Sequence, residues 1–148
     1  MSLISSSDQQ KLRELFAGMK RPVRLLFFTQ TLGCETCLQT RQILDELPAL
    51  SDRIAIEEVN LILENERAAP YRVDRAPAIA VEYKDAATDQ WIDSRIRFLG
   101  APAGYEFISL AQAVLLAGGG PSNLSEASRR LITAVDRPVV MNVFTTPG

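Results

Sequence analysis

The sequence predicts an α/β fold with a central mixed sheet, and three patterns support this. Residues 23–29 are nearly all apolar, which is typical of a central strand that is covered on both faces. Helix-like and strand-like segments alternate after this run, as they do in a β-α-β unit. Residues 78–99 carry two strand-like segments around a polar loop, which indicates a hairpin. The expected order is helix, β, α, β, α, β, β, α.

The ends of the helices follow from local signals. Ser7 and Gln10 have the spacing of a capping box, Pro48 ends the second helix, and Gly104 precedes the last helix of this set. Apolar residues recur at helical intervals between these signals. The expected elements are helices over residues 8–20, 34–47 and 105–117, strands over residues 23–29, 54–60, 78–83 and 92–99, and a polar helical crossover over residues 63–71.

The two cysteines of the chain, Cys34 and Cys37, form a C-x-x-C motif between the apolar strand and the second helix. A sulfur at a helix N-terminus lies near unpaired N–H groups and the positive end of the helix dipole, which stabilise a thiolate. Thiolate is the species that attacks disulfides. We expect Cys34 to attack a substrate disulfide and Cys37 to resolve the mixed disulfide. This second step is intramolecular, so its effective thiol concentration is high.

Glu35 and Thr36, which lie between the cysteines, are expected to modulate the pKa of the Cys34 thiol. A neighbouring carboxylate opposes thiolate formation, whereas the helix dipole and the Thr36 hydroxyl favour it. This balance predicts a moderate nucleophile and a redox potential of about −270 to −200 mV, nearer the reducing end than about −120 mV. A thiol pKa near about 3.5 would contradict the prediction.

Composition and charge argue against several other functions. Histidine is absent, so imidazole is not available as a base or ligand. The formal net charge of −2 gives no basic field for nucleic acid, and no apolar stretch approaches the roughly 20 residues of a membrane span. Residues 1–10 show no secretory signal. We therefore expect a cytoplasmic protein with no nucleic-acid or membrane partner, no metal and no cofactor.

A C-x-x-C motif also occurs in structural bridges and zinc sites. No further Cys or His completes a tetrahedral site within one chain, so redox chemistry is favoured. Two copies of the chain supply four thiolates, however. A non-catalytic dimer that holds a metal or a [2Fe–2S] cluster therefore stays an alternative.

The end of the chain repeats its beginning after the linker at residues 118–121. We expect residues 1–119 to form the redox domain and residues 120–148 to be the linker, helix and first strand of a second unit, which stops before its own C-x-x-C. Residues 139–144 are too apolar to lie free in solvent and are expected to pair with a sheet edge of their own domain or of a second copy, giving a homodimer. A shift of 116 places aligns Leu131-Ile132 with Leu15-Phe16, Arg137-Pro138-Val139 with Arg21-Pro22-Val23, and Phe144-Thr145 with Phe28-Thr29.

The order of elements, the C-x-x-C motif and the Ala76-Pro77 pair together resemble the thioredoxin and glutaredoxin superfamily. Residues 71–78 (YRVDRAPA) and 98–107 (FLGAPAGYEF) more closely resemble the N-terminal unit of tandem-thioredoxin, glutaredoxin-like protein disulfide oxidoreductases. The resemblance covers most of residues 8–145. It implies a thioredoxin-like fold, a cis peptide bond at Pro77 facing the cysteines, and a second active unit after Gly148.

The resemblance also bears on substrate binding. Pro77 would keep the backbone at Ala76 open beside Cys34, so that an extended substrate strand can pair there. Arg75 is a candidate for steering acidic partners or assisting thiolate formation, although an ordinary solvated arginine explains it equally well. Two departures are visible, because Glu35-Thr36 replaces the Gly-Pro pair of thioredoxin and Phe28 lies where thioredoxin carries a buried acid.

We therefore expect an enzyme, a thiol–disulfide oxidoreductase that reduces protein disulfides. Its expected partners are disulfide-containing proteins and an electron donor such as a thioredoxin reductase or a small thiol. A second hypothesis is an electron-relay module for peroxide detoxification. It is similar to the tandem thioredoxin domains that are attached to flavoprotein peroxiredoxin reductases.

Overall fold

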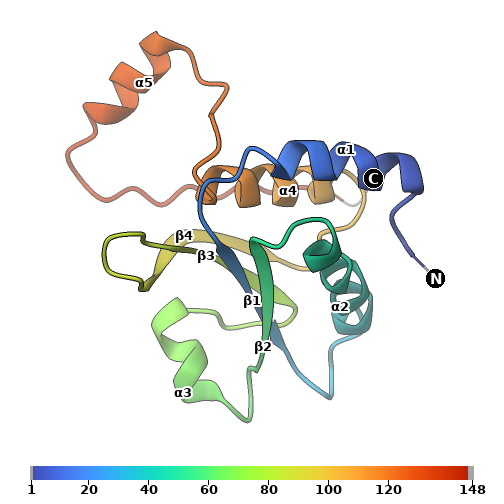
Figure 1. Cartoon of the computed structure of the whole chain (residues 1–148). Coiled ribbons are helices and arrows are strands. Elements are labelled where there is room, and N and C mark those ends of the chain that lie inside the picture. Colours follow the sequence, from blue (N-terminus) through green and yellow to red (C-terminus); the bar gives the residue numbers. More distant parts are fainter. Residues whose placement is uncertain (1, 147–148) are drawn as a thin grey trace.

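The computed structural model describes residues 2–146, in which four strands form one mixed sheet in the order β2-β1-β3-β4 (Figure 1). β1 (Val23–Thr29) runs parallel to β2 (Ile54–Asn60) on one side and antiparallel to β3 (Ala78–Lys84) on the other. β4 (Trp91–Leu99) completes the sheet as an edge strand antiparallel to β3. This arrangement confirms the predicted fold class and the order of the elements.

The helices cover the two faces of the sheet unequally. α1, α2 and α4 pack on one face around a core that includes Phe27, Leu44 and Leu110. The other face has a smaller apolar cluster around Phe28, to which the short α3 contributes Ala68. None of the described helices is long and apolar enough to cross a membrane. The helices are α1 (Ser6–Phe16), α2 (Cys37–Asp45), α3 (Asn65–Ala68), α4 (Tyr105–Ala117) and α5 (Glu126–Thr133), with 3-10 turns at Leu47–Ala49 and Ala69–Tyr71.

The first helix begins earlier than the sequence pattern indicates. Ser5, not Ser7, is the N-cap residue, and its hydroxyl accepts a hydrogen bond from the amide of Asp8 at 3.1 Å. The same hydroxyl donates to the Asp8 carboxylate at 2.6 Å. Because an acid lies three residues after Ser5, this serine satisfies the orphan donors of the first turn best. The helix ends at Phe16, and the amide of Lys20 then donates to the carbonyl of Gly118.

A buried ion pair lies on the sheet face that carries α3. Glu82 of β3 is only 2% exposed, and Arg24 of β1 reaches its carboxylate at 2.6 Å. Arg24 also donates to Glu57 of β2 at 2.9 Å, and its guanidinium lies 4.7 Å from the centre of the Trp91 ring. One arginine thus links all four strands, and it compensates a carboxylate that would otherwise be costly to bury.

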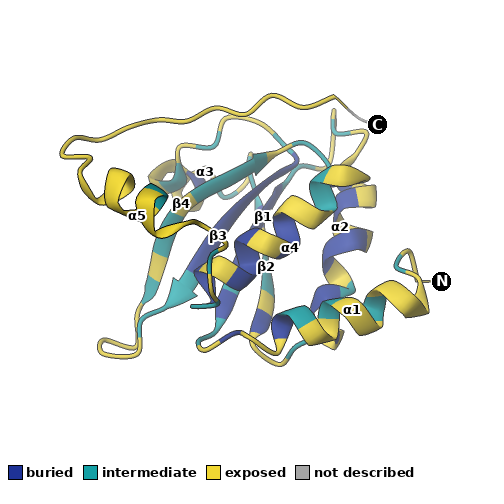
Figure 2. Ribbon diagram, turned by 90° about the horizontal axis from the view of Figure 1, so that it is seen from above, coloured by how far each residue is buried: buried dark blue, intermediate teal, exposed yellow. Residues whose placement is uncertain are grey.

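The C-terminal segment contradicts part of the sequence prediction. The expected helix of this segment is present as α5, which Ser125 caps. Residues 139–144 form no strand and pair with no edge of this chain's sheet. Val140 is 85% and Phe144 is 93% exposed, and Figure 2 shows the segment running outside the folded domain. An apolar run becomes a strand only when another strand supplies its hydrogen bonds, and this chain supplies none there.

We predict that Arg24→Met lowers the free energy of unfolding by about 3 kcal/mol, because it leaves the Glu82 carboxylate buried without its cation. Urea denaturation at pH 7 measures the change. Lys11→Ala is the control, since the Lys11–Asp8 pair is exposed and its loss is expected to cost less than about 1 kcal/mol. Equal losses for the two variants would contradict the prediction.

Candidate redox site

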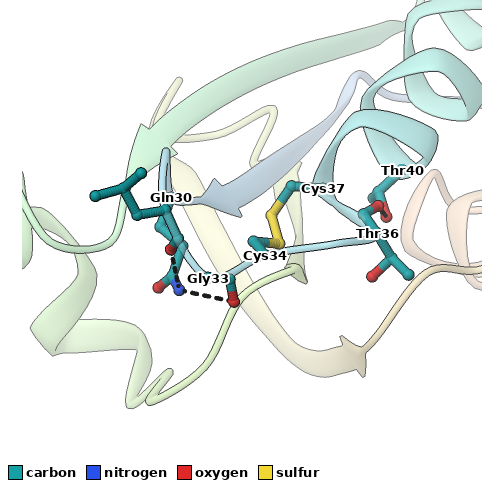
Figure 3. The surroundings of a disulfide bond; sticks show 7 residues. Gln30, Gly33, Cys34, Thr36, Cys37 and Thr40 are labelled. Atoms are coloured by element: carbon teal, nitrogen blue, oxygen red, sulfur yellow. Dashed lines mark hydrogen bonds between the residues drawn. A yellow bond between two sulfur atoms is a disulfide. The ribbon is translucent and has the colours of Figure 1, made fainter.

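The two cysteines lie just beyond the carboxyl end of β1, where they form a disulfide (Figure 3). Their Cα atoms are 5.5 Å apart. Cys37 is the first residue of α2 and is 7% exposed, whereas Cys34 is half-buried and therefore the more accessible of the two. The expectation that the helix begins at Cys34 is wrong by three residues. The Cys34 sulfur nevertheless lies at the first turn of α2, because it is bonded to Cys37.

A glutamine side chain shapes the loop that leads to Cys34. The amide nitrogen of Gln30 donates to the carbonyls of Leu32, at 2.9 Å, and Gly33, at 3.3 Å (Figure 3). Gly33 has a φ of 72°, which glycine adopts without strain. Gln30 thus holds two carbonyls of the turn between β1 and α2. The sequence analysis did not select Gln30, since a glutamine after a strand is too common to signal such a role.

The residues between the cysteines lie at the start of α2. Thr36 is the N-cap residue, but its side chain makes no capping hydrogen bond. Its carbonyl instead accepts from the amide of Thr40, at 3.0 Å, and from the Thr40 hydroxyl, at 2.8 Å. Thr40 is fully buried and so fixes the first turn of α2. Glu35 is exposed.

The loop before β3 reaches the same end of the sheet. Ala78 at the start of β3 pairs with Phe28 near the end of β1, so the preceding residues lie beside the loop that carries Cys34. The Ala76–Pro77 peptide bond is cis, as the family resemblance implies. The Pro77 carbonyl accepts a hydrogen bond from the amide of Gly100 at 2.9 Å, which ties the loop after β4 to the same site.

Solved structures with the same architecture include redox proteins. The NTD_N/C domain of the alkylhydroperoxide reductase AhpF from Enterococcus faecalis V583 superposes with a TM-score of 0.77 at 25% identity, over 90% of this chain and 62% of that one. A mutant of AhpF from the same organism gives 0.75 at 27% identity, over 90% and 61%. A protein disulfide oxidoreductase from Aeropyrum pernix K1 gives 0.70 at 22% identity, over 88% and 54%.

The chain belongs to the thioredoxin-like superfamily. No protein-family model matches it, and no curated protein matches it in sequence. The chain spans about three fifths of the AhpF chains that it resembles. The fold, its neighbours and the Cys34–Cys37 pair together support a redox protein of the thiol–disulfide oxidoreductase type.

This thioredoxin-like protein carries Phe28 at the position where, according to the sequence analysis, thioredoxin has a buried acid. Phe28 is fully buried, and its ring centre lies 5.6 Å from that of Tyr71. The position therefore carries a packing residue. Among the described residues, no group of three or more Cys, His, Asp or Glu side chains is placed to hold a metal ion.

Arg75 lies two residues before Pro77 and pairs with its neighbour Asp74 at 2.9 Å. The arginine side chain is 63% exposed. Its hydrogen bond to Asp74 raises the pKa of Arg75 and lowers the pKa of the Asp74 carboxyl. Arg75 and Asp74 thus form an exposed pair of opposite charges beside the cis proline.

Tyr71 anchors the chain ahead of the cis proline, and the sequence analysis did not identify this role. Its hydroxyl donates to the buried Glu82, and its carbonyl accepts from Nε of Arg97 at 3.1 Å. The Arg97 guanidinium lies 5.5 Å from the centre of the Tyr71 ring and is held at 2.7 Å from Asp93. Burial, together with the hydrogen bond to Glu82, raises the pKa of Tyr71 from 10.0 to about 12. The phenol therefore keeps its proton between pH 10 and about 12, where a tyrosine of ordinary pKa ionises.

We predict that Tyr71→Phe destabilises the protein by about 1 kcal/mol at pH 7, because the hydrogen bond to Glu82 is lost. Above pH 10, Tyr71 ionises in the unfolded chain but stays neutral in the folded protein up to about 12. The raised pKa therefore stabilises the fold below pH 10, and this contribution is lost as the pH rises toward 12.

The difference in the free energy of unfolding between the wild type and Tyr71→Phe should therefore shrink between pH 10 and 12. Urea denaturation at several pH values measures this difference. Tyr105→Phe, at a tyrosine that is 82% exposed, is the control and should follow the wild type. Parallel profiles for Tyr71→Phe and the wild type would count against this role.

Proposed function

We propose that this protein reduces disulfide bonds in other proteins by dithiol–disulfide exchange at Cys34 and Cys37. The observation that carries the proposal is the unequal exposure of the bonded pair, with Cys34 half-buried and Cys37 buried behind it at the start of α2. An accessible sulfur suits the attacking role, and a buried neighbour suits the resolving role.

The cycle starts from the reduced dithiol. The Cys34 thiolate attacks one sulfur of the substrate disulfide, a mixed disulfide forms, and the other substrate sulfur leaves as a thiolate. The Cys37 thiolate then attacks the Cys34 sulfur, which forms the Cys34–Cys37 bond and releases the second substrate thiol. Two electrons pass to the substrate, and an electron donor, such as a thioredoxin reductase or two molecules of a small thiol, returns them to the protein. The oxidised end of this cycle is the form that Figure 3 shows.

The substrate would bind as an extended segment beside the cis proline. Ala76 precedes this proline at the same end of the sheet as Cys34, where its backbone can pair with a substrate strand. Such a reductase needs surroundings that keep dithiols reduced, so we place it in the cytoplasm. Disulfide-containing proteins are the proposed partners.

We predict that Cys37→Ser accumulates a covalent complex with a disulfide substrate such as insulin, because Cys34 still attacks but nothing resolves the mixed disulfide. Non-reducing gel electrophoresis and mass spectrometry measure the complex. Cys34→Ser is the matched control and should form none. Turnover by the wild type with a small-thiol donor should vanish in both variants. A Cys34→Ser variant that retained activity would refute the assigned roles.

An electron relay for hydroperoxide reduction is the second candidate function. It is favoured by the likeness to AhpF, an alkylhydroperoxide reductase, to which this chain is 25 to 27% identical over the matched residues. In that role the dithiol would pass electrons to a dedicated peroxiredoxin instead of to many proteins. Comparison of turnover on insulin with turnover on a peroxiredoxin separates the two functions.

We infer that residues 120–146 begin a second unit and that they associate with another copy of this chain. Residues 137–145 match the residues that lead into and form β1, yet they lack the neighbouring strands that β1 has. The run Val139–Phe144 is exposed, and the outer edges of β2 and β4 are unpaired within the described sheet. A second copy offers such an edge.

We predict a dimer in light scattering, with protection of residues 123–145 from limited proteolysis. Val143→Lys, which places a charge in the apolar run, should shift the protein to a monomer that is cleaved in this segment. Lys11→Glu changes charge at the exposed α1 and should leave the dimer intact. A wild-type monomer that is cleaved readily there would defeat the inference.

A further inference from the structure

An apolar pocket of about 530 Å³ opens beside α3, outside the redox site described above. Its apolar lining comes from the turn after β2, from α3 and its following 3-10 turn, and from the segment before the cis proline. Asn65, Glu66 and Asp74 also line it. The apolar lining residues are Leu61, Ile62, Ala68, Ala69 and Val73.

The pocket lies at the redox end of the sheet. The amide of Leu61 donates to the carbonyl of Thr29 at 2.8 Å, so the pocket adjoins the last residue of β1, five residues before Cys34. On its other side, Val73 precedes Pro77 by four residues. Figure 1 shows α3 at the same end of the sheet as the loop that leads into α2.

The segment that joins this pocket to the cis proline has free backbone groups. The amide of Arg72 donates to Ala69, and ladder pairing starts again at Ala78. Within the described chain, the amides and carbonyls of residues 73–76 make no backbone–backbone hydrogen bond. Unpaired groups in a row are what an extended peptide needs in order to add itself as a strand.

We propose that this pocket binds an apolar side chain of the extended substrate segment whose cysteine Cys34 attacks. The proposal rests on the proposed function and adds a sequence preference to it. Val73 and Ala76 are three residues apart, which is at most about 10 Å, and the chain bends at residues 75–77. An apolar side chain two to four residues from the substrate cysteine therefore reaches the pocket when the substrate pairs along residues 73–76. A peptide suits this place better than a small molecule, because only a peptide uses the pocket and the free backbone groups together.

The test uses nonapeptides with a central cysteine linked to 2-nitro-5-thiobenzoate, whose release is coloured. Leucine or serine is placed two, three or four residues from the cysteine on either side. Single-turnover rates with the reduced protein should favour leucine over serine about tenfold at one of these positions, as expected for partial burial of a leucine side chain. Equal rates for leucine and serine at every position would overturn the proposal.

Ile62→Asp should abolish the leucine preference, so that leucine and serine peptides react at about the same rate, because a carboxylate replaces an apolar side chain that lines the pocket. Ile62 is 66% exposed, so the substitution is not expected to affect folding. Ile108→Asp is the matched control, at an isoleucine that is 62% exposed on α4, which packs on the face of the sheet opposite α3, and it should keep the preference. Both variants should reduce the small disulfide 5,5′-dithiobis(2-nitrobenzoate) at the wild-type rate.

The outcomes separate this proposal from the proposed function. If the wild type reduces all peptides at equal rates, the proposal that the pocket binds substrate is wrong, whereas the proposed reductase function stands. A wild type that reduces neither the peptides nor the small disulfide overturns the reductase itself. If Ile62→Asp changes the mass in light scattering and leaves the leucine preference unchanged, the pocket is a contact between copies of this chain and the proposal is wrong.

Discussion

β1 pairs with β2 along one edge and with β3 along the other, and both of its faces are buried. Because both faces are packed, the position of β1 in the sheet is well defined, and the end of β1 sets the position of the redox site. The loop to Cys34 leaves from Thr29, and β3 begins opposite Phe28, which brings the cis proline to the same place. A shift of one residue in the register would turn Arg24 away from the buried Glu82 and toward the apolar core on the other face, so the position of the site depends on the packing of β1 rather than on contacts within the site.

The two faces of the sheet are stabilised in different ways. Three helices cover one face with apolar side chains. The other face carries one short helix and a polar network in which Arg24 and Tyr71 both bind the buried Glu82. Since Tyr71 also lies six residues before Pro77, the network that satisfies a buried charge holds the loop that would receive the substrate. Tyr71 thus joins the buried Glu82 to the segment that leads to the cis proline, and Arg97 holds the same tyrosine through its carbonyl.

The C-terminal segment shows how strongly strand formation depends on partners. Val23–Thr29 and the similar run at residues 139–145 have comparable apolar character, yet only the first is a strand. β1 has strands on both sides and helices over one face, whereas Phe144 is 93% exposed. The inferred association with a second copy gives the later run the neighbours that the earlier one already has.

The sequence by itself determined β1 and the last helix of the domain, because an unbroken apolar run and a glycine-bounded apolar helix are local signals. It also identified Cys34 and Cys37, and the family resemblance identified the cis bond at Pro77. Local signals were ambiguous where several residues offer the same chemistry, as at Ser5 and Ser7 around the start of α1. Only the tertiary structure decided that Ser5 is the cap, that Gln30 and Tyr71 shape the loops, and that a pocket lies beside Val73. The contacts of Tyr71 with Glu82 and Arg97, and the lining of the pocket, bring together residues that are distant in the chain, so no spacing within the sequence encodes them. The contacts of Ser5 and Gln30 span only two or three residues, but such residues are too common for the sequence to single these out, and only the folded backbone decides.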